Sequence, residues 1–165
     1  MAEVPVHVRP AVPGDVAAII PLVKESWART YDPAIGVAER QRISGAKHVR
    51  SLFESEYLPG SGFGFVAHDR DGTLIGQAAG EWRDNGAIAF IDRIHVEPDW
   101  KGRGVAQALL DAVAAMARQK GAVVELTVLH GNARAIAFYL KSGFGKVHKV
   151  DGLSGIPADL MRLEP

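Results

Sequence analysis

The chain has 165 residues, of which 47% are hydrophobic and 23% are charged, and these proportions are typical of a globular protein with one domain over residues 1–165. Its 19 basic residues balance its 19 acidic residues, and this neutrality argues against a general nucleic-acid-binding protein, which must neutralise several phosphates. The absence of cysteine excludes disulfides and cysteine-ligated zinc, and because neither a signal peptide nor a membrane-spanning run is visible, we expect a cytoplasmic protein without a membrane partner.

The first third of the chain reads as one strand followed by helices. Residues 6–9 have the pattern of a short strand, and Asp15 is placed to cap a helix that continues to about residue 28. A second, weaker helical stretch covers about residues 38–57. The sequence Pro59-Gly60-Ser61-Gly62 then ends the helical pattern.

The middle of the chain has the pattern of strands joined by tight turns. The turn sequences Asp69-Arg70-Asp71-Gly72 and Asn85-Gly86 are typical of hairpins. They separate three expected strands, at residues 63–68, 73–82 and 87–96. We therefore expect an antiparallel meander.

The last third of the chain contains the clearest helix, over residues 105–120, with an apolar stripe and Gly121 as its terminator. The remaining expected elements are a strand at 123–129, a helix from about 132 to 141, and strands at 144–150 and 159–163. This order of elements predicts an α+β fold with a mixed sheet.

The loop before that helix, Lys101-Gly102-Arg103-Gly104-Val105-Ala106, has the composition of an anion-binding turn. Glycines at 102 and 104 permit backbone conformations that a side chain would forbid, and they let amide groups approach a ligand. The helix that follows supplies unpaired N–H groups and a partial positive charge, to which Lys101 and Arg103 add. An ordinary turn before a helix is the alternative interpretation.

Two nucleotide-binding motifs are excluded at this loop by spacing. A Walker loop requires Lys followed by Ser or Thr after its last glycine, and this pair is absent. The dinucleotide fingerprint requires a third glycine or alanine three residues after the second glycine, where Gln107 stands.

Three features in order resemble the GNAT N-acetyltransferase superfamily. The segment Lys101-x-x-Gly104-x-Ala106 is similar to the family's acyl-CoA signature, with lysine in place of arginine or glutamine at its first position. Residues 91–98, Ile-Asp-Arg-Ile-His-Val-Glu-Pro, look like the family's fourth strand and its proline-marked end. A later block with Asn132, Tyr139 and Phe144 resembles the family's second conserved region.

The resemblance implies a GNAT-like central sheet, mostly antiparallel, that splays open between its fourth and fifth strands and is flanked by helices. It also implies acetyl-CoA as co-substrate. The pantetheine arm would pair with the exposed backbone of Ile94, His95 and Val96, with Asn132 helping to position it. The pyrophosphate would contact the amides of Arg103, Gly104, Val105 and Ala106, close to Lys101 and Gly102.

The expected reaction is direct attack of an amine on the thioester. The resemblance implies that Tyr139 protonates the departing thiolate, although its helical spacing also fits a core residue. A base is useful because a lysine-like ammonium has a pKa of about 10.4. Asp92 and Glu81 are rival candidates for this base, because strand alternation, and a bulge if one is present, decide which face of the sheet each side chain takes. His95 has a suitable ordinary pKa but is equally interpreted as a histidine that lines the pocket.

The acceptor is expected to be a small-molecule primary amine. A protein N-terminus or lysine is the second alternative, disfavoured because Thr127 stands where protein-acetylating relatives often carry glutamate. A non-catalytic acyl-CoA sensor is the third, and a homodimer is left open. The histidines show no paired metal spacing and no G-x-S-x-G elbow occurs, so we expect neither a metal site nor a serine hydrolase.

Overall fold

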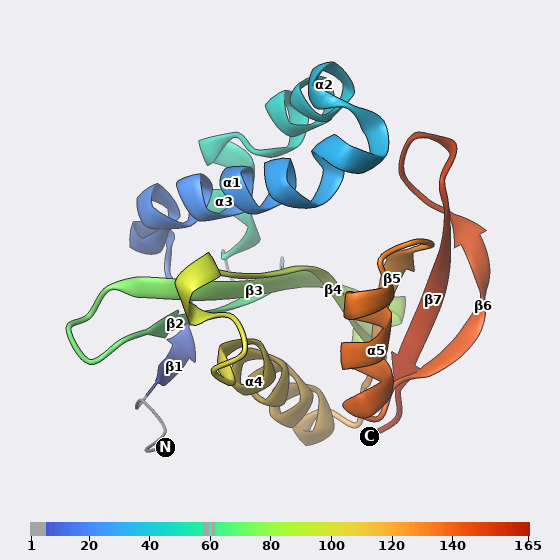
Figure 1. Cartoon of the computed structure of the whole chain (residues 1–165). Helices are drawn as coiled ribbons and strands as arrows, with labels where there is room; N and C mark the ends of the chain where they lie inside the picture. The colour runs from blue at the N-terminus through green and yellow to red at the C-terminus, as the bar shows by residue number, and fades with distance from the viewer. Residues whose placement is uncertain (1–5, 58–59, 61) are drawn as a thin grey trace.

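The central feature of the molecule is a mixed sheet whose middle strands come from consecutive hairpins (Figure 1). The computed structural model describes residues 6–57, 60 and 62–165. Their strands are β1 (His7–Pro10), β2 (Gly62–His68), β3 (Leu74–Arg83), β4 (Ile88–Val96), β5 (Val123–Leu129), β6 (Gly145–Asp151) and β7 (Pro157–Leu163). The order across the sheet is β1-β2-β3-β4-β5-β7-β6, and every neighbouring pair is antiparallel except β4 and β5. The predicted meander and the closing pair of strands are both confirmed.

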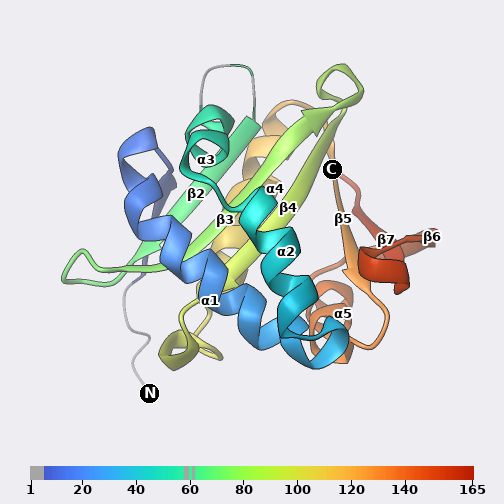
Figure 2. The ribbon, with the colours of Figure 1, turned by 90° about the horizontal axis from the view of Figure 1, so that it is seen from above.

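Helices cover both faces of this sheet, as Figures 1 and 2 show from two directions. One face carries α1 (Val16–Ile35), α2 (Val37–Lys47) and α3 (Arg50–Glu56), and the other carries α4 (Val105–Gln119) and α5 (Ala133–Lys141). Short 3-10 turns occupy Pro13–Asp15, Asp84–Gly86, Pro98–Trp100 and Leu153–Gly155. Within the described residues, no helix is long and apolar enough to cross a membrane.

Each helical layer has its own apolar core. Under α1 and α3, buried Val16, Ile19, Val23 and Trp27 meet Phe53 and Val66. On the opposite face, the stripe of α4 that the sequence predicts is buried at Val105, Leu109 and Val113. Both helical layers are therefore fixed to the sheet by apolar burial, which is the main favourable term in folding.

Three expectations about the first helices are wrong. The first helix continues past residue 28 to Ile35, where Gly36 ends it with φ 85°. Asp15 makes no side-chain capping bond to α1, because its carboxylate accepts hydrogen bonds from Arg9 and from the Val12 N–H. The second helical stretch is two helices, α2 and α3, separated at His48, whose side chain turns into the core. The predicted break at Pro59 and Ser61 lies outside the described residues.

The sheet splays open between β4 and β5, as expected. These parallel strands pair only at Ile88–Val123, Ala89–Val124 and Phe90–Glu125. Beyond Phe90, β4 continues to Val96 beside β3, whereas β5 continues to Leu129 beside β7. The separation leaves the second half of β4 with an unpaired edge toward β5 among the described strands.

Candidate functional site

The open edge of β4 presents backbone groups into the splay. The Glu97 N–H donates to the Ile75 carbonyl oxygen at 2.8 Å, so the backbone at Glu97, and by alternation at His95, faces β3. Ile94 and Val96 therefore turn their N–H and C=O groups toward the gap left by β5. An extended ligand with amide groups has donors and acceptors to pair with at this edge. The geometry fits the pantetheine contact expected around residues 94–96.

The glycine-rich loop lies at the end of that edge and leads directly into α4. Gly102 and Gly104 have φ values of 75° and 84°, in the region that favours glycine. Gly104 is the N-terminal cap of α4, and Val105 and Ala106 begin the helix. Because the first N–H groups of a helix have no carbonyl partner one turn earlier, they remain available to an anion. A Cβ on either glycine would meet no atom within 4 Å.

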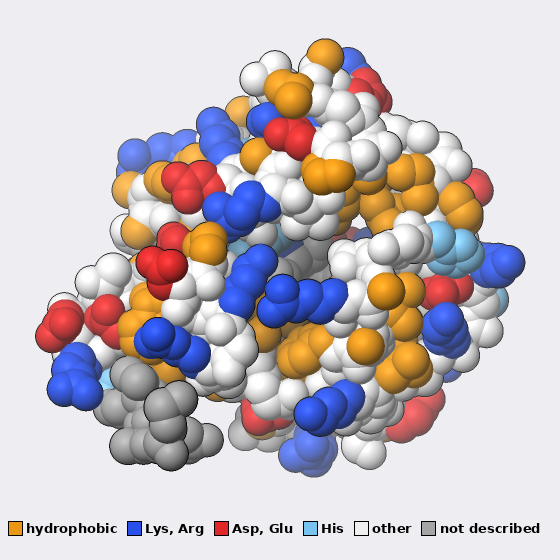
Figure 3. Space-filling view, in the orientation of Figure 1, with side chains coloured by type: hydrophobic (Ala, Val, Ile, Leu, Met, Phe, Trp, Pro, Cys, Tyr) orange, Lys and Arg blue, Asp and Glu red, His pale blue; other side chains and the backbone are white. Residues whose placement is uncertain are grey.

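Basic side chains from three elements surround the loop. The pKa of Lys101 is lowered by burial first, and then by the positive charges of Arg29 on α1 and Arg134 on α5. The Arg103 guanidinium lies 5.1 Å from the centre of the Trp100 ring. Figure 3 shows Lys and Arg side chains beside the hollow at the centre of this face. Arg29 and Arg134 were not predicted, because nothing in their local sequence indicates which way they point.

Asn132 is the N-cap of α5 and Tyr139 lies within that helix, beside the splay. The Asn132 Oδ1 accepts a hydrogen bond from the Ala135 N–H at 3.3 Å, so this side chain caps the helix. The Tyr139 ring packs between Phe138 and Phe144, with ring centres 5.1 Å and 5.4 Å away. Burial, and to a lesser extent Tyr31, raises the pKa of the Tyr139 phenol. This phenol therefore keeps its proton near neutral pH and can act as a donor.

Asp92 lies at a β-bulge. Gly80 of β3 pairs with Ile91 and Ala79 pairs with Arg93, so Asp92 is the extra residue of β4. Its side chain is exposed to solvent, although protein atoms around it partly desolvate the carboxyl group. Burial first, and then the negative charge of Glu81, raises the pKa of Asp92 to about 6. Such a carboxylate is poised to exchange a proton near neutral pH.

The rival carboxylate, Glu81, is close to Asp92 but differs in its contacts. Glu81 is exposed on β3, and its Oε1 accepts a hydrogen bond from Arg83 Nε at 2.7 Å. Asp92 makes no hydrogen bond or ion pair with any described residue. Of the two candidates that the sequence left open, Asp92 is the one whose oxygens are free.

The His95 ring points away from the splay and into the layer under α1. Its Nδ1 lies 2.7 Å from the Ser26 Oγ, and its Nε2 is buried without a partner among the described residues. Burial, followed by the charges of Arg93, His48 and other basic groups, lowers the pKa of His95 to about 3. This imidazole is therefore neutral, and its contacts favour a buried histidine over a base. Among the described residues, no three His, Asp or Glu side chains gather as metal ligands.

Comparisons with known proteins place these features in a family. The sequence model of the acetyltransferase (GNAT) family matches residues 24–144, from within α1 to the residue before β6. An uncharacterised N-acetyltransferase of Methanocaldococcus jannaschii is 35% identical over 95 residues, which cover 54% of this chain and 42% of that protein. The chain thus spans less than half the length of this relative.

Two further matches cover more of the chain. The aminoglycoside N(6')-acetyltransferase type 1 of Stenotrophomonas maltophilia is 30% identical over 121 residues, which cover 69% of each protein. The crystal structure of the PaiA N-acetyltransferase of Thermoplasma acidophilum in complex with coenzyme A has the same fold, with a TM-score of 0.84, 20% identity, and coverage of 98% of this chain and 99% of that one. Since the family model covers most of the sequence, from α1 through the glycine-rich loop to the end of α5, the chain belongs to the GNAT acetyltransferase family, whose co-substrate is acetyl-CoA.

Proposed function

We propose that this protein transfers the acetyl group of acetyl-CoA to a primary amine of a small molecule by direct attack. The observation that carries the proposal is the Asp92 carboxylate, which has no partner among the described residues and lies on the strand whose open edge leads to the glycine-rich loop. A proton acceptor and a place for a thioester donor are then adjacent. The similarity to an aminoglycoside acetyltransferase supports a small-molecule acceptor.

In this proposal the cofactor lies along the splay. Its pantetheine amides pair with the backbone of residues 94–96, and the Asn132 side-chain amide helps to position the arm. Its pyrophosphate binds the amides of residues 104–106, with Lys101 and Gly102 beside it. The Arg103 N–H, which the sequence also suggests, already donates to the Trp100 carbonyl oxygen at 3.3 Å. Arg29 and Arg134 add positive charge at the same place, because both act on Lys101.

The proposed reaction needs no covalent enzyme intermediate. The amine nitrogen attacks the thioester carbonyl carbon, and the developing oxyanion accepts a hydrogen bond from the Val96 N–H. The C–S bond then breaks, and the thiolate takes the Tyr139 phenolic proton. The proton lost by nitrogen passes to Asp92, directly or through water, with Glu81 as the alternative acceptor. The products are an amide and free coenzyme A.

Two measurements test the proposal. Calorimetric titration with acetyl-CoA is expected to show binding, and thiol release is expected with small amines such as aminoglycosides and polyamines. Release with lysine or N-terminal peptides alone would favour the protein-acetylating alternative. Tight binding without release from any amine would favour the acyl-CoA sensor, and no binding would contradict all three functions.

A further inference from the structure

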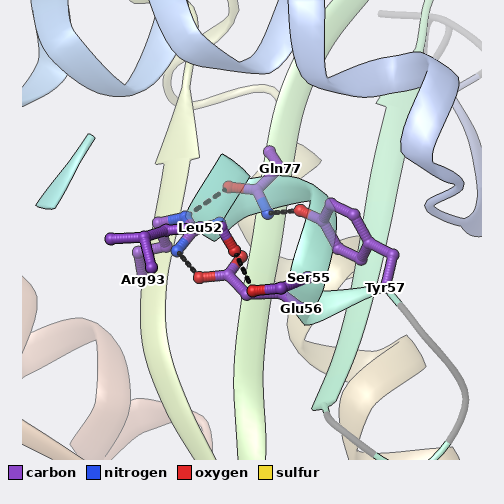
Figure 4. Close-up of polar contacts among 6 residues, drawn as sticks. All are labelled: Leu52, Ser55, Glu56, Tyr57, Gln77 and Arg93. Carbon is purple, nitrogen blue, oxygen red and sulfur yellow. Dashed lines mark hydrogen bonds and ion pairs between the residues drawn. The ribbon is translucent and has the colours of Figure 1, made fainter. Parts of the chain in front are cut away.

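The residue after the bulge, Arg93, is held in a polar network that ties β4 to α3 (Figure 4). Its Nη1 and Nη2 donate to the two carboxylate oxygens of Glu56, at 3.0 Å and 2.6 Å. Its Nε donates to the Oε1 of Gln77 at 3.1 Å, and the Gln77 Nε2 donates to the Tyr57 hydroxyl at 3.1 Å. The guanidinium carbon also lies 4.3 Å from the centre of the Phe53 ring. Every side-chain nitrogen of Arg93 therefore has a partner, either Glu56 on α3 or Gln77 on β3.

The neighbouring carboxylate makes none of these contacts. Asp92 is adjacent to Arg93 in sequence, and after Glu81 the charges of Arg93 and Glu56 act on its pKa. When an arginine pairs with a carboxylate, the pair is frequently bidentate. Here Glu56 takes that place, and Asp92 has no hydrogen-bond or ion-pair partner among the described residues.

A second arginine near the bulge is neutralised in the same way. Arg83 donates to Glu81 at 2.7 Å, on the strand opposite Asp92. The charged groups that act on Asp92 are thus two carboxylates, Glu56 and Glu81, and the two arginines that they pair with. The positive charges nearest to Asp92 are both balanced by other residues.

We infer that Glu56 is a positioning residue for the proposed reaction: by holding the Arg93 guanidinium against α3, it keeps the Asp92 carboxylate free of an ion pair and available to take the proton of the acceptor amine. This inference rests on the proposed role of Asp92 as base. Glu56 itself touches neither substrate nor cofactor in this scheme.

Removal of the Glu56 charge and removal of the Arg93 charge are therefore expected to shift the pKa of Asp92 in opposite directions. Without the Glu56 charge, Arg93 is unbalanced and free to turn toward Asp92, and an unbalanced arginine next to an aspartate lowers the carboxylate pKa by about one to three units. Without Arg93, the Glu56 charge remains and the pKa of Asp92 rises. A loss of packing alone would not produce shifts of opposite sign.

Carbon-13 NMR titration of the side-chain carboxyls measures the pKa of Asp92, and it does not require the acceptor amine to be known. The Asp92 resonance is identified by its loss in Asp92→Asn, and in the unaltered protein its midpoint is expected near pH 6. Glu56→Gln, which keeps the shape of the side chain, is expected to lower the midpoint by about one unit. Arg93→Gln is expected to raise it, and a double variant to return it toward the original value.

The matched control is Asp15→Asn. Asp15 pairs bidentately with Arg9, at 2.9 Å and 2.7 Å, beside β1 and away from the bulge. This variant loses an arginine–carboxylate pair of the same geometry, and the Asp92 midpoint is expected not to move. If Glu56→Gln fails to fold, the upward shift in Arg93→Gln still tests the charge balance.

A kinetic experiment distinguishes failure of the inference from failure of the proposed function. With an amine that supports thiol release, the acid limb of kcat is expected to disappear in Asp92→Asn and to move to lower pH in Glu56→Gln. An acid limb that persists in Asp92→Asn would contradict the base assignment and the inference with it. Unmoved Asp92 midpoints in both single variants, with the limb still dependent on Asp92, would overturn the positioning role alone.

Discussion

At the scale of single residues, locally determined features could be predicted from sequence and register-dependent features could not. The positive φ values of Gly102 and Gly104 and the capping bond of Asn132 follow from residue type and from the adjacent helix start. The choice between Asp92 and Glu81 depends on a bulge, and a bulge is a property of two paired strands. The Arg93–Glu56 pair joins residues 37 positions apart, so neither partner signals the other in the sequence.

The proposed acid role of Tyr139 can be tested separately from the packing of its ring. Replacement by Phe keeps the ring between Phe138 and Phe144 and removes only the phenolic oxygen. We expect kcat to fall about 100-fold, the lower range for loss of a positioned acid, with little change in the KM for acetyl-CoA. Steady-state kinetics with the best amine of the panel measures both quantities. An unchanged kcat would reduce Tyr139 to a packing residue.

At the scale of elements, the prediction was most accurate where periodicity and turn chemistry agree. The strand at 123–129 matches β5, and the helix at 105–120 differs from α4 by one residue at its end. The division into α2 and α3 was missed because it depends on tertiary contacts. There, buried His48 packs edge-on against Trp27 at 4.8 Å, and its Nδ1 lies 2.6 Å from the Ser44 Oγ.

The prediction at the scale of elements concerns Gly104, at the junction between the glycine-rich loop and α4. Gly104→Val forces a β-branched residue into a left-handed conformation, so we expect a loss of stability of about 1–2 kcal/mol without steric clash. The amides that begin α4 would also move, and acetyl-CoA affinity is expected to fall at least about tenfold, which corresponds to about 1.4 kcal/mol. Calorimetry and thermal unfolding measure the two effects.

Gly121→Val is the matched control for that variant. Gly121 follows α4 at its other end, has φ 65°, and also has no atom within 4 Å of an added Cβ. It therefore carries a similar conformational cost away from the proposed pyrophosphate site. Equal acetyl-CoA affinities in the two valine variants would show that the loop does not hold the pyrophosphate.

At the scale of the whole molecule, the layer between α1–α3 and the sheet contains two neutral histidines. Burial is the first cause of the lowered pKa at both, which falls to about 4 for His48 and about 3 for His95, from an ordinary value of 6.5. The unfolded chain therefore binds more protons than the native state below pH 6.5. Their contribution to stability is complete above that pH and is lost as the pH falls toward 4. Asp92, whose pKa is raised, opposes this trend over the same window but is one group against two.

His48→Gln tests this account of acid sensitivity. The unaltered protein is expected to lose on the order of 1 kcal/mol or more between pH 7 and pH 5, seen as a Tm lower by a few degrees. Glutamine removes one of the two titrating groups, so the fall in Tm between these pH values is expected to shrink, even if the variant is less stable at pH 7. His148→Gln, on exposed β6, is the control and is expected to keep the original pH dependence. Parallel pH profiles for the two variants would show that the buried histidine does not link protonation to unfolding, and the acid sensitivity would then belong to other groups.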